Sequence, residues 1–313
     1  MVILDKIHPV LIEKFARKGL NCVDVSEKPK TTIYREIKTA TGIVVRSKIV
    51  LSEEILKKCE SLKFIGRVGS GLENIDLKYC KKNNISVYNS PEGNRTAVAE
   101  HSLAMLLCLL NNISITQKEI EKGVWERDQN SGTELSGKTI GIIGYGNNGS
   151  ALADVLSGFN VRILVYDKYK KIAKTEGIRQ TELREIQKEA DIISINIPLN
   201  KETKECINKK FIKAFKKPIY IINISRGQIV KTKDLVEAIK NNKVIGACLD
   251  VLEYESNDFY LNFQNQNEEL QYLIKSPNVL ITPHIAGLTQ ESYYKLSAIL
   301  AEKILTEYQS NTP

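Results

Sequence analysis

A glycine-rich turn between two apolar segments is the most informative feature of this sequence. The apolar stretch Thr139–Ile143 runs into Gly144, Gly146 and Gly149, and a helix-like segment then leads to a second apolar stretch over 161–166, which ends in an acid. Strand, glycine turn, helix, strand and acid in this order are typical of a dinucleotide-binding unit. A bare Gly-x-Gly-x-x-Gly could be an ordinary turn, but the flanking strands and the acid favour a bound dinucleotide.

Each part of this turn has a physical task. Gly144 permits the tight turn, Gly146 lets the backbone approach a pyrophosphate, and Gly149 allows the helix to pack closely on the strand. The helix is predicted to begin near Asn148, where free N–H groups and the helix dipole favour an anion. Asp167 lies 18 residues past Gly149, so we expect it to accept hydrogen bonds from the adenosine ribose.

Length and composition leave room for two globular domains and argue against other classes. The chain has 313 residues, 42% of them hydrophobic. Its net charge of +8 comes from dispersed lysines, which predicts a solvated surface that weakly attracts anions and no nucleic-acid partner. The six scattered cysteines predict reduced thiols and no metal. Charged residues directly after the N-terminus and an apolar run of only 103–110 predict a cytoplasmic protein with no membrane partner.

Short apolar strands alternate with amphipathic segments along most of the chain. This alternation predicts parallel sheets with helices on both faces. In the first block, strands are predicted at 2–4, 22–25, 42–45, 64–67 and 86–88, and helices at 10–18, 53–58 and 76–82. In the second block, strands are predicted at 140–143, 162–166, 192–196, 219–222, 244–249 and 279–281.

The fold class that follows is α/β, with two doubly wound parallel-sheet domains. A Rossmann nucleotide domain over 100–286 is inserted into a flavodoxin-like domain made of 1–99 and 287–313. Ligands of such sheets bind beyond the carboxyl ends of the strands, which predicts chemistry in the cleft between the domains. The same patterns predict one long helix over 94–123, a surface loop with about one helical turn over 255–275, and a C-terminal helix over 290–308.

Three polar residues that follow predicted strands have the side chains that hydride transfer needs. A nicotinamide cofactor transfers hydride itself, but the protein must bind the substrate carboxylate, polarise its carbonyl and move a proton. We interpret His284 as general acid and base rather than as a structural histidine, because histidine changes protonation near neutral pH. Arg226 offers a planar fork for a carboxylate, although it could be a surface arginine paired with an acid. Glu255 is placed to hold the far nitrogen of His284, although loop glutamates are usually solvated.

Two further features are candidates for binding. Asp250, directly after a predicted strand, is assigned to the nicotinamide side of the cofactor. Gly69 and Gly71 expose N–H groups at a strand–helix junction, a nest suited to a carboxylate, and a plain glycine turn is the alternative. The remaining histidines are interpreted as structural, because His8 precedes a proline and His101 lies in an apolar helix.

Together these residues resemble the D-isomer-specific 2-hydroxyacid dehydrogenases over essentially the whole chain. The stretches 135–149, 223–227, 249–251 and 282–284 carry the likeness. The resemblance implies NAD as cofactor and Arg226, Glu255 and His284 as catalytic residues. It also implies cofactor contacts from Ser70, Gly144, Gly146, Asn147, Asn148, Gly149, Asp167, Ile197, Pro198, Ile224, Ser225, Asp250 and Gly287. Two features depart from the family: Ser256 replaces the proline that usually follows the glutamate, and the polar stretch before His284 is longer.

Within the family the chain is most similar to the D-3-phosphoglycerate dehydrogenases of serine biosynthesis, through segments 45–48 and 65–69. The likeness implies that basic residues hold a substrate phosphate, although one or two of them could be ordinary surface charges. The implied substrate-binding set is Arg46, Lys48, Arg67, Gly69, Ser70 and Gly71. Because the chain stops at Pro313, a short form without a regulatory domain is expected.

Several alternatives stay open. Glyoxylate/hydroxypyruvate reductase and D-lactate dehydrogenase use the same scaffold, and a non-catalytic NAD-sensing protein is an alternative of another class. Asp167 favours NAD over NADP by repelling a 2′-phosphate, while the lysines at 168, 170 and 171 weaken that preference. The resemblance also implies a homodimer through the nucleotide domains, with the 94–123 helix and the Trp125 region at the contact.

Overall fold

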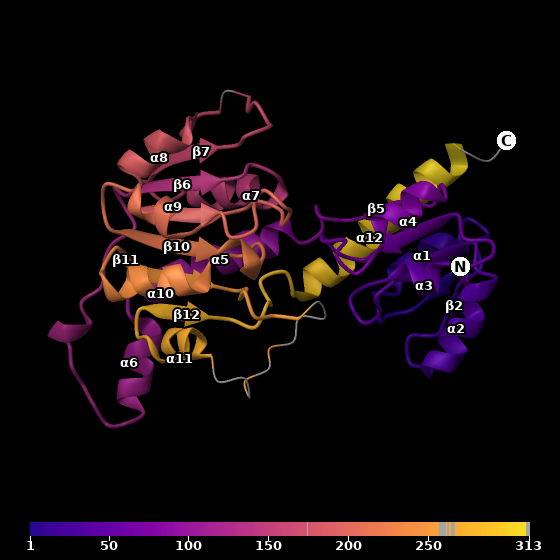
Figure 1. Ribbon diagram of the computed structural model, residues 1–313, viewed down its shortest axis with the longest axis horizontal. Helices are drawn as coiled ribbons and strands as arrows, with labels where there is room; N and C mark the ends of the chain where they lie inside the picture. The colour runs from indigo at the N-terminus through magenta and orange to yellow at the C-terminus, as the bar shows by residue number, and fades with distance from the viewer. Residues whose placement is uncertain (174, 257–260, 262, 264–266, 311–313) are drawn as a thin grey trace. The chain divides into compact units, whose positions relative to one another are not determined.

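The computed structural model describes residues 1–313 except 174, 257–260, 262, 264–266 and 311–313, and the side chains of 308–310. The chain divides into two compact units, one made of Met1–Arg95 with Leu288–Pro313 and the other of Thr96–Gly287. Each unit is a parallel sheet with helices on both faces, as the α/β prediction requires (Figure 1). The sequence patterns place the divisions after residues 99 and 286, and the structure has them after Arg95 and Gly287.

The first unit has the strand order of a flavodoxin-like sheet. Its strands pair as β2-β1-β3-β4-β5, all parallel. Fully buried Leu11, Phe15 and Leu300 pack α1 and α12 against one face, which confirms that the C-terminal helix returns to this unit. The elements are β1 (Val2–Ile3), α1 (Val10–Ala16), β2 (Val23–Asp24), α2 (Lys30–Lys38), β3 (Gly42–Val45), α3 (Glu53–Leu56), β4 (Phe64–Arg67), α4 (Leu77–Lys82), β5 (Ser86–Asn89) and α12 (Gln290–Ser310).

The second unit has Rossmann topology. Its strands pair as β12-β11-β10-β9-β6-β7-β8, so the strand order reverses at β6, next to β9, where such sheets bind their ligands. The elements are α5 (Arg95–Leu110), α6 (Ile113–Ile120), η1 (Asp128–Asn130), β6 (Thr139–Ile143), α7 (Asn147–Leu156), β7 (Arg162–Tyr166), β8 (Ile178–Gln180), α8 (Leu183–Glu189), β9 (Ile192–Ile195), α9 (Lys209–Lys213), β10 (Ile219–Asn223), η2 (Gly227–Ile229), α10 (Thr232–Lys240), β11 (Val244–Leu249), α11 (Glu268–Lys275) and β12 (Val279–Ile281).

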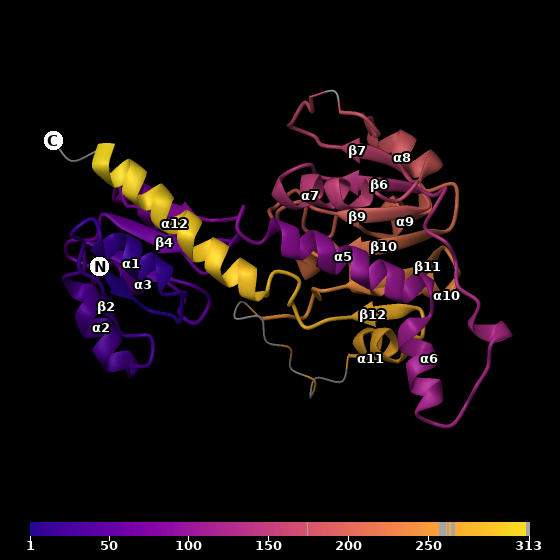
Figure 2. The same cartoon turned by 180° about the vertical axis from the view of Figure 1, so that it is seen from behind.

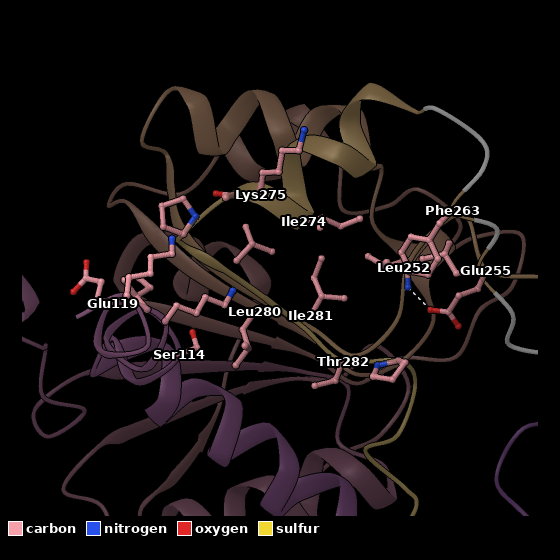
Figure 3. Close-up of a pocket in the computed structure, with 18 residues that line it drawn as sticks. Ser114, Glu119, Leu252, Glu255, Phe263, Ile274, Lys275, Leu280, Ile281 and Thr282 are labelled. Atoms are coloured by element: carbon pink, nitrogen blue, oxygen red, sulfur yellow. Dashed lines mark hydrogen bonds between the residues drawn. The ribbon is translucent and has the colours of Figure 1, made fainter. Parts of the chain in front are cut away.

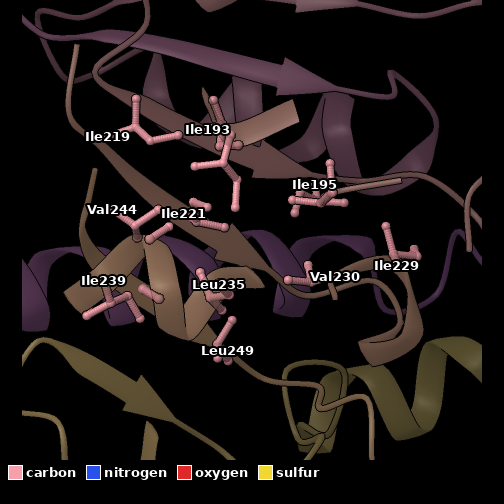
Figure 4. Packing of buried hydrophobic residues seen from close by; sticks show 14 of the residues in the cluster. Ile193, Ile195, Ile219, Ile221, Ile229, Val230, Leu235, Ile239, Val244 and Leu249 are labelled. Atoms are coloured by element: carbon pink, nitrogen blue, oxygen red, sulfur yellow. The ribbon is translucent and has the colours of Figure 1, made fainter. Parts of the chain in front are cut away.

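The central strands of the second unit, β9 to β11, are mostly apolar runs because both faces of the sheet are covered there. Successive residues of β10 point to opposite faces, so Ile219 and Ile221 pack with α10 while Ile222 packs with α5 and α7. Figure 4 shows Ile221 beside Leu235 of α10. Figure 2 shows α5 and α7 on the other face. This double burial leaves the carboxyl ends of the strands as the places where polar side chains gather.

The predicted long helix over 94–123 is wrong: the segment forms two helices, α5 and α6, bent by 59°. Asn112 lies at the break with a left-handed φ of 54°, a conformation that asparagine tolerates better than most residues. The apolar spacing continues on both sides of the break, so periodicity did not reveal it. No single helix in the described part of the chain is long and apolar enough to cross a membrane, although α5 and α6 together reach that length and composition.

The polar stretch 255–275 contains more helix than predicted. Helix α11 (Glu268–Lys275) has Asn267 as its N-cap, whose side chain accepts a hydrogen bond from Leu270 N at 2.9 Å. Leu270 and Leu273 are buried and attach the helix to the core. Much of the stretch before it, 257–260, 262 and 264–266, lies outside the described residues. The sequence patterns also missed α2 and the short edge strand β8.

Candidate active site

The three glycines after β6 have the conformations and surroundings expected of a phosphate-binding turn. Gly144 has a φ of +91°, and a Cβ there would overlap the carbonyl of Asn196. A Cβ at Gly149 would overlap the carbonyl oxygen of Gly144, so only glycine lets the helix pack this close. Around Gly146 nothing lies within 4 Å of a Cβ position, and α7 begins at Asn147. The turn therefore presents open backbone and a helix N-terminus, which suits a pyrophosphate.

Asp167 follows β7, next to the glycine turn. Its carboxylate accepts hydrogen bonds from the backbone N–H groups of Tyr145 (2.8 Å), Tyr169 (3.0 Å) and Lys170 (2.9 Å). Burial acts to raise the pKa of Asp167, but these three donors and the charge of Lys170 outweigh it, so the pKa is lowered. The carboxylate is therefore held ionised beside the turn.

The lysines beyond Asp167 interact with other groups. Lys168 forms an ion pair with Glu202, and Tyr169 donates its hydroxyl to the same carboxylate at 2.7 Å. The ammonium of Lys170 donates to the carbonyl of Tyr145 at 3.2 Å and lies 5.7 Å from the centre of its ring. Two of the three lysines that could favour a 2′-phosphate thus have partners of their own.

Four predicted cofactor residues follow the ends of β9 and β10. Ile197 follows β9, and its methyl group would lie 2.8 Å from a Cβ at Gly144. Pro198 comes next, and its carbonyl accepts a hydrogen bond from Thr203. After β10, Ile224 is buried in the core, and the hydroxyl of Ser225 donates to the carbonyl of Ile195 at 2.7 Å.

Arg226 follows Ser225 directly at the end of β10. Its Nη1 donates to the carbonyl of Ser225 at 2.6 Å, and Asn223 Nδ2 donates to the carbonyl of Arg226 at 3.1 Å. The glycine that follows is required by a close approach: a Cβ at Gly227 would overlap the carbonyl group of Leu252. This contact joins the turn after β10 to the turn after β11 and places Arg226 beside the segment that carries Glu255.

Glu255 and His284 form a hydrogen-bonded pair. His284 Nδ1 lies 2.7 Å from Glu255 Oε2, and the other carboxylate oxygen accepts from the backbone N–H of Leu252. Both side chains are largely enclosed, 14% exposed for Glu255 and 21% for His284. Because a carboxylate only accepts, Nδ1 carries a proton and the lone pair of a neutral ring lies on Nε2. The ring is thus oriented to exchange a proton at Nε2.

Asp250 supports the loop that carries His284. Asp250 is 1% exposed, and its carboxylate accepts hydrogen bonds from Thr282 Oγ1 (2.6 Å), Ile285 N (2.9 Å) and Ala286 N (2.9 Å). The structure therefore gives Asp250 a role in holding the loop that sequence reasoning missed, beside its predicted contact with the nicotinamide. Gly287, the last residue of the unit, follows this loop.

A cavity of about 770 Å³ within the second unit reaches Glu255. Helices α6 and α11 and strand β12 surround it, and most of its lining is apolar. Figure 3 shows Glu255 and Thr282 towards one end and Ser114 and Glu119 of α6 towards the other.

In the first unit, two of the predicted phosphate-binding residues line one cavity. Arg46 and Lys48 follow β3 and lie beside a space of about 400 Å³ that also includes Asp5, Ser26 and Glu27. Asp5 accepts from the backbone N–H of Arg46, and Lys48 Nζ donates to the carbonyl of Ser26 at 2.7 Å. The guanidinium of Arg46 lies 5.6 Å from the centre of the Tyr293 ring.

The structure does not place Arg67 at this cavity. Arg67 is 8% exposed, and its guanidinium occupies the space where a Cβ of Gly69 would be. Gly69 has a φ of +151°, so glycine is needed there for both conformation and space. Ser70 donates its hydroxyl to Asn94 Oδ1 at 2.8 Å, and Asn89 Nδ2 donates to the carbonyl of Ser70. Gly71 follows in the same turn, before α4.

Two residues of the site escaped sequence reasoning. Leu252 contributes only its backbone, donating to Glu255, and no side-chain pattern signals such a contact. Thr282 bonds to Asp250 across two neighbouring strands, and only its place before the Pro-His pair could have drawn attention to it. Among the residues that the structure describes, no group of three or more His, Cys, Asp or Glu side chains is arranged to hold a metal ion.

Comparison with known proteins identifies the family of this chain. Residues 103–286 match the model of the "D-isomer specific 2-hydroxyacid dehydrogenase, NAD binding domain". The chain belongs to the D-isomer specific 2-hydroxyacid dehydrogenases. In this family the second unit is the NAD-binding domain, which agrees with the open turn at Gly146 and the acid at Asp167.

Three similar proteins of this family carry the names of three different dehydrogenases or reductases. D-3-phosphoglycerate dehydrogenase of Bacillus subtilis is 34% identical over 303 residues, 96% of this chain but only 54% of that protein. Glyoxylate reductase of Pyrococcus furiosus is 32% identical over 296 residues, 92% of this chain and 85% of that protein. The crystal structure of D-lactate dehydrogenase of Aquifex aeolicus, complexed with NAD and lactic acid, is similar with a TM-score of 0.81 and 31% identity, covering 99% of this chain and 95% of that one. The chain thus spans about half the length of the phosphoglycerate dehydrogenases that it matches.

Proposed function

We propose that the chain is an NAD-dependent oxidoreductase that interconverts a D-2-hydroxy acid and its 2-oxo acid. The hydrogen bond of 2.7 Å between Glu255 and His284 carries this proposal, because it orients an enclosed imidazole for proton transfer at Nε2. The turn at Gly144–Gly149 with Asp167 would hold the cofactor. A nicotinamide cofactor bound there would supply reversible hydride transfer at the hydroxy carbon of the substrate.

The proton and the carboxylate of the substrate are handled by this chain's own residues. In oxidation, neutral His284 takes the hydroxyl proton on Nε2, and Glu255 stabilises the imidazolium that results. In reduction the protonated ring returns that proton to the oxygen. Arg226 would bind the carboxylate with its planar fork and polarise the neighbouring carbonyl, since its backbone is held at the strand end next to Leu252.

D-3-phosphoglycerate, oxidised to 3-phosphohydroxypyruvate, is the substrate that we infer. Several relatives with this activity in their names are 30% or more identical over most of the chain. Arg46 and Lys48 beside one cavity supply the positive charge that a phosphate requires. The Gly69–Gly71 segment is proposed for the substrate carboxylate, and Ser70 additionally for a cofactor contact.

Glyoxylate or hydroxypyruvate reduction is a second candidate. The glyoxylate reductase of Pyrococcus furiosus matches along 85% of its own length, whereas the phosphoglycerate dehydrogenases match along about half of theirs. A smaller substrate without phosphate would need Arg226 but not the charges of Arg46 and Lys48.

A substrate panel separates these activities. The purified chain is assayed with 3-phosphohydroxypyruvate, hydroxypyruvate, glyoxylate and pyruvate, each with NADH and NADPH, and with 3-phosphoglycerate, D-glycerate and D-lactate in the other direction. Arg46→Ala should raise KM for phosphorylated substrates only, and Lys6→Met, beside the same cavity but paired with Glu27, is the matched control. A strong preference for glyoxylate would select the second candidate. Binding of NADH without turnover of any acid would indicate a sensor and refute the enzyme.

We also propose a homodimer formed through the second unit. Apolar side chains of α6 and the stretch after it are exposed, Ile113 by 54%, Ile120 by 50% and Trp125 by 78%, and they lie on or follow the helix that borders the 770 Å³ cavity. A second copy covering these residues would remove them from water. Sedimentation of the wild type and of Ile120→Glu tests this: we expect a dimer and a monomer respectively, and a monomeric wild type would refute the proposal.

A further inference from the structure

The loop that carries His284 is held in an unusual conformation. His284 has a φ of 56°, in the left-handed region that non-glycine residues seldom adopt. Its backbone N–H donates to the carbonyl of Asp250 at 2.8 Å and lies 3.0 Å from that of Thr282. A residue held in this region needs support from its surroundings. The position of the imidazole therefore depends on what fixes residues 282–286.

The support reaches beyond Asp250 to a histidine on α5. His101 Nε2 lies 3.0 Å from Thr282 Oγ1 and 3.6 Å from Asp250 Oδ1. Thr282 has one hydroxyl proton, and its shortest contact is with Asp250 Oδ1 at 2.6 Å, whereas Met105 Sδ lies at 3.6 Å. The hydroxyl therefore donates to the carboxylate, so the proton between His101 and Thr282 comes from His101 Nε2.

We propose that His101 is a positioning residue for proton transfer by His284, a role that rests on the proposed function. Its Nε2–H fixes the hydroxyl of Thr282 on Asp250, and Asp250 in turn holds the N–H groups of Ile285 and Ala286. Buried carboxylates need a complete set of donors. Without the N–H of His101, the Thr282 hydroxyl is held less firmly on Asp250. The donors around Asp250 then loosen, and the imidazole of His284 loses its alignment with the reacting oxygen.

The place of His101 in the chain gives this network a second consequence. Helix α5 begins at Arg95, where the chain passes from the first unit to the second, and the supported loop ends at Gly287, where it passes back. The bond from His101 to Thr282 thus ties together, within the second unit, the two segments through which the chain enters and leaves it.

Two substitutions at one position separate positioning from general packing. His101→Leu removes the donor at similar size, whereas the side-chain amide of His101→Gln places an N–H where Nε2 lies. We expect His101→Leu to lower kcat about 10²-fold, the scale of a 1 Å misplacement, with the Kd for NADH little changed. His101→Gln should retain most of kcat and the pH profile of the wild type. Ser102→Ala is the matched control, because the Ser102 hydroxyl donates within α5, to the carbonyl of Val98 at 2.7 Å.

Histidine NMR gives a readout that needs no turnover. The chain has only three histidines, so ¹⁵N-histidine spectra are simple to assign. We expect neutral His101 as the Nε2–H tautomer and His284 as the Nδ1–H tautomer, and we expect His101→Leu, but not His101→Gln, to shift the His284 signals. A wild type with these tautomers but no activity would refute the proposed function alone.

The opposite results would overturn the positioning role. These are a His101→Leu enzyme with wild-type kcat, or a His101→Gln enzyme as slow as His101→Leu. A double-mutant cycle with Thr282→Val adds a check where both single variants fold, because members of one network should give a combined loss well below the product of the separate losses. Independent, multiplicative losses would also refute the proposal.

Discussion

Replacing Gly227 by alanine tests how the site is assembled. A Cβ at this position would overlap the carbonyl group of Leu252 and come well inside 3.0 Å of Glu253 N. All these atoms are backbone, so no side chain can rotate away, and the two turns must separate by about 1 Å. Overpacking of this kind costs about 1–3 kcal/mol, and we expect the upper end because the obstacle is main chain.

The consequence should appear in stability and in turnover together. For a unit of this size about 3 kcal/mol corresponds to a Tm lower by roughly 6–12 °C. Leu252 donates to Glu255, and Glu255 holds His284, so the displacement reaches the imidazole. Because a misplacement of 1 Å can cost about 10²-fold in rate, kcat should fall by that order below the new Tm.

Differential scanning calorimetry and initial rates measure both effects. Gly158→Ala is the matched control, since nothing lies within 4 Å of a Cβ there, and it should change Tm by only a few degrees and leave kcat intact. If Gly227→Ala melts and turns over like the wild type, the contact between the turns after β10 and β11 does not hold the site together.

Four further outcomes are expected. Glu255→Gln should lower kcat about 10³-fold, because its amide would face His284 with a donor and impose the wrong tautomer; normal rates would exclude the pair from proton transfer. Arg226→Lys should lose most turnover, since an ammonium cannot reproduce the planar fork, and unchanged kinetics would rule out the clamp. Because the pKa of Asp167 is lowered, its carboxylate stabilises the folded protein above the ordinary pKa of 3.8, and this stabilisation is lost as the pH falls below that value. In urea unfolding, Asp167→Asn should therefore lose less stability between pH 5 and pH 2 than the wild type. Equal losses would contradict this. Asn112→Leu should lower the free energy of unfolding by about 1–2 kcal/mol and Asn112→Gly by less, because of the left-handed φ; equal effects would deny that the backbone is strained there.

Features that depend on local backbone requirements and on burial could be predicted from the amino-acid sequence. The need for glycine at 144 and 149 follows from φ and close packing, and the apolar runs of β9 to β11 follow from a sheet covered on both faces. Each of these requirements limits the residue types that one short segment can carry, so the sequence of that segment reveals it. The order and type of most elements, the two fold classes and the family could therefore be predicted.

Several contacts between residues far apart in the sequence became visible in the folded structure alone. The approach of Gly227 to Leu252, the bond of Thr282 to Asp250 and the bond of His101 to Thr282 each join separate strands or helices. Such partners depend on strand register and on turn geometry, and a pattern within one segment carries no information on either. The break at Asn112 was hidden for a related reason, since apolar spacing records burial and not the φ of a single residue.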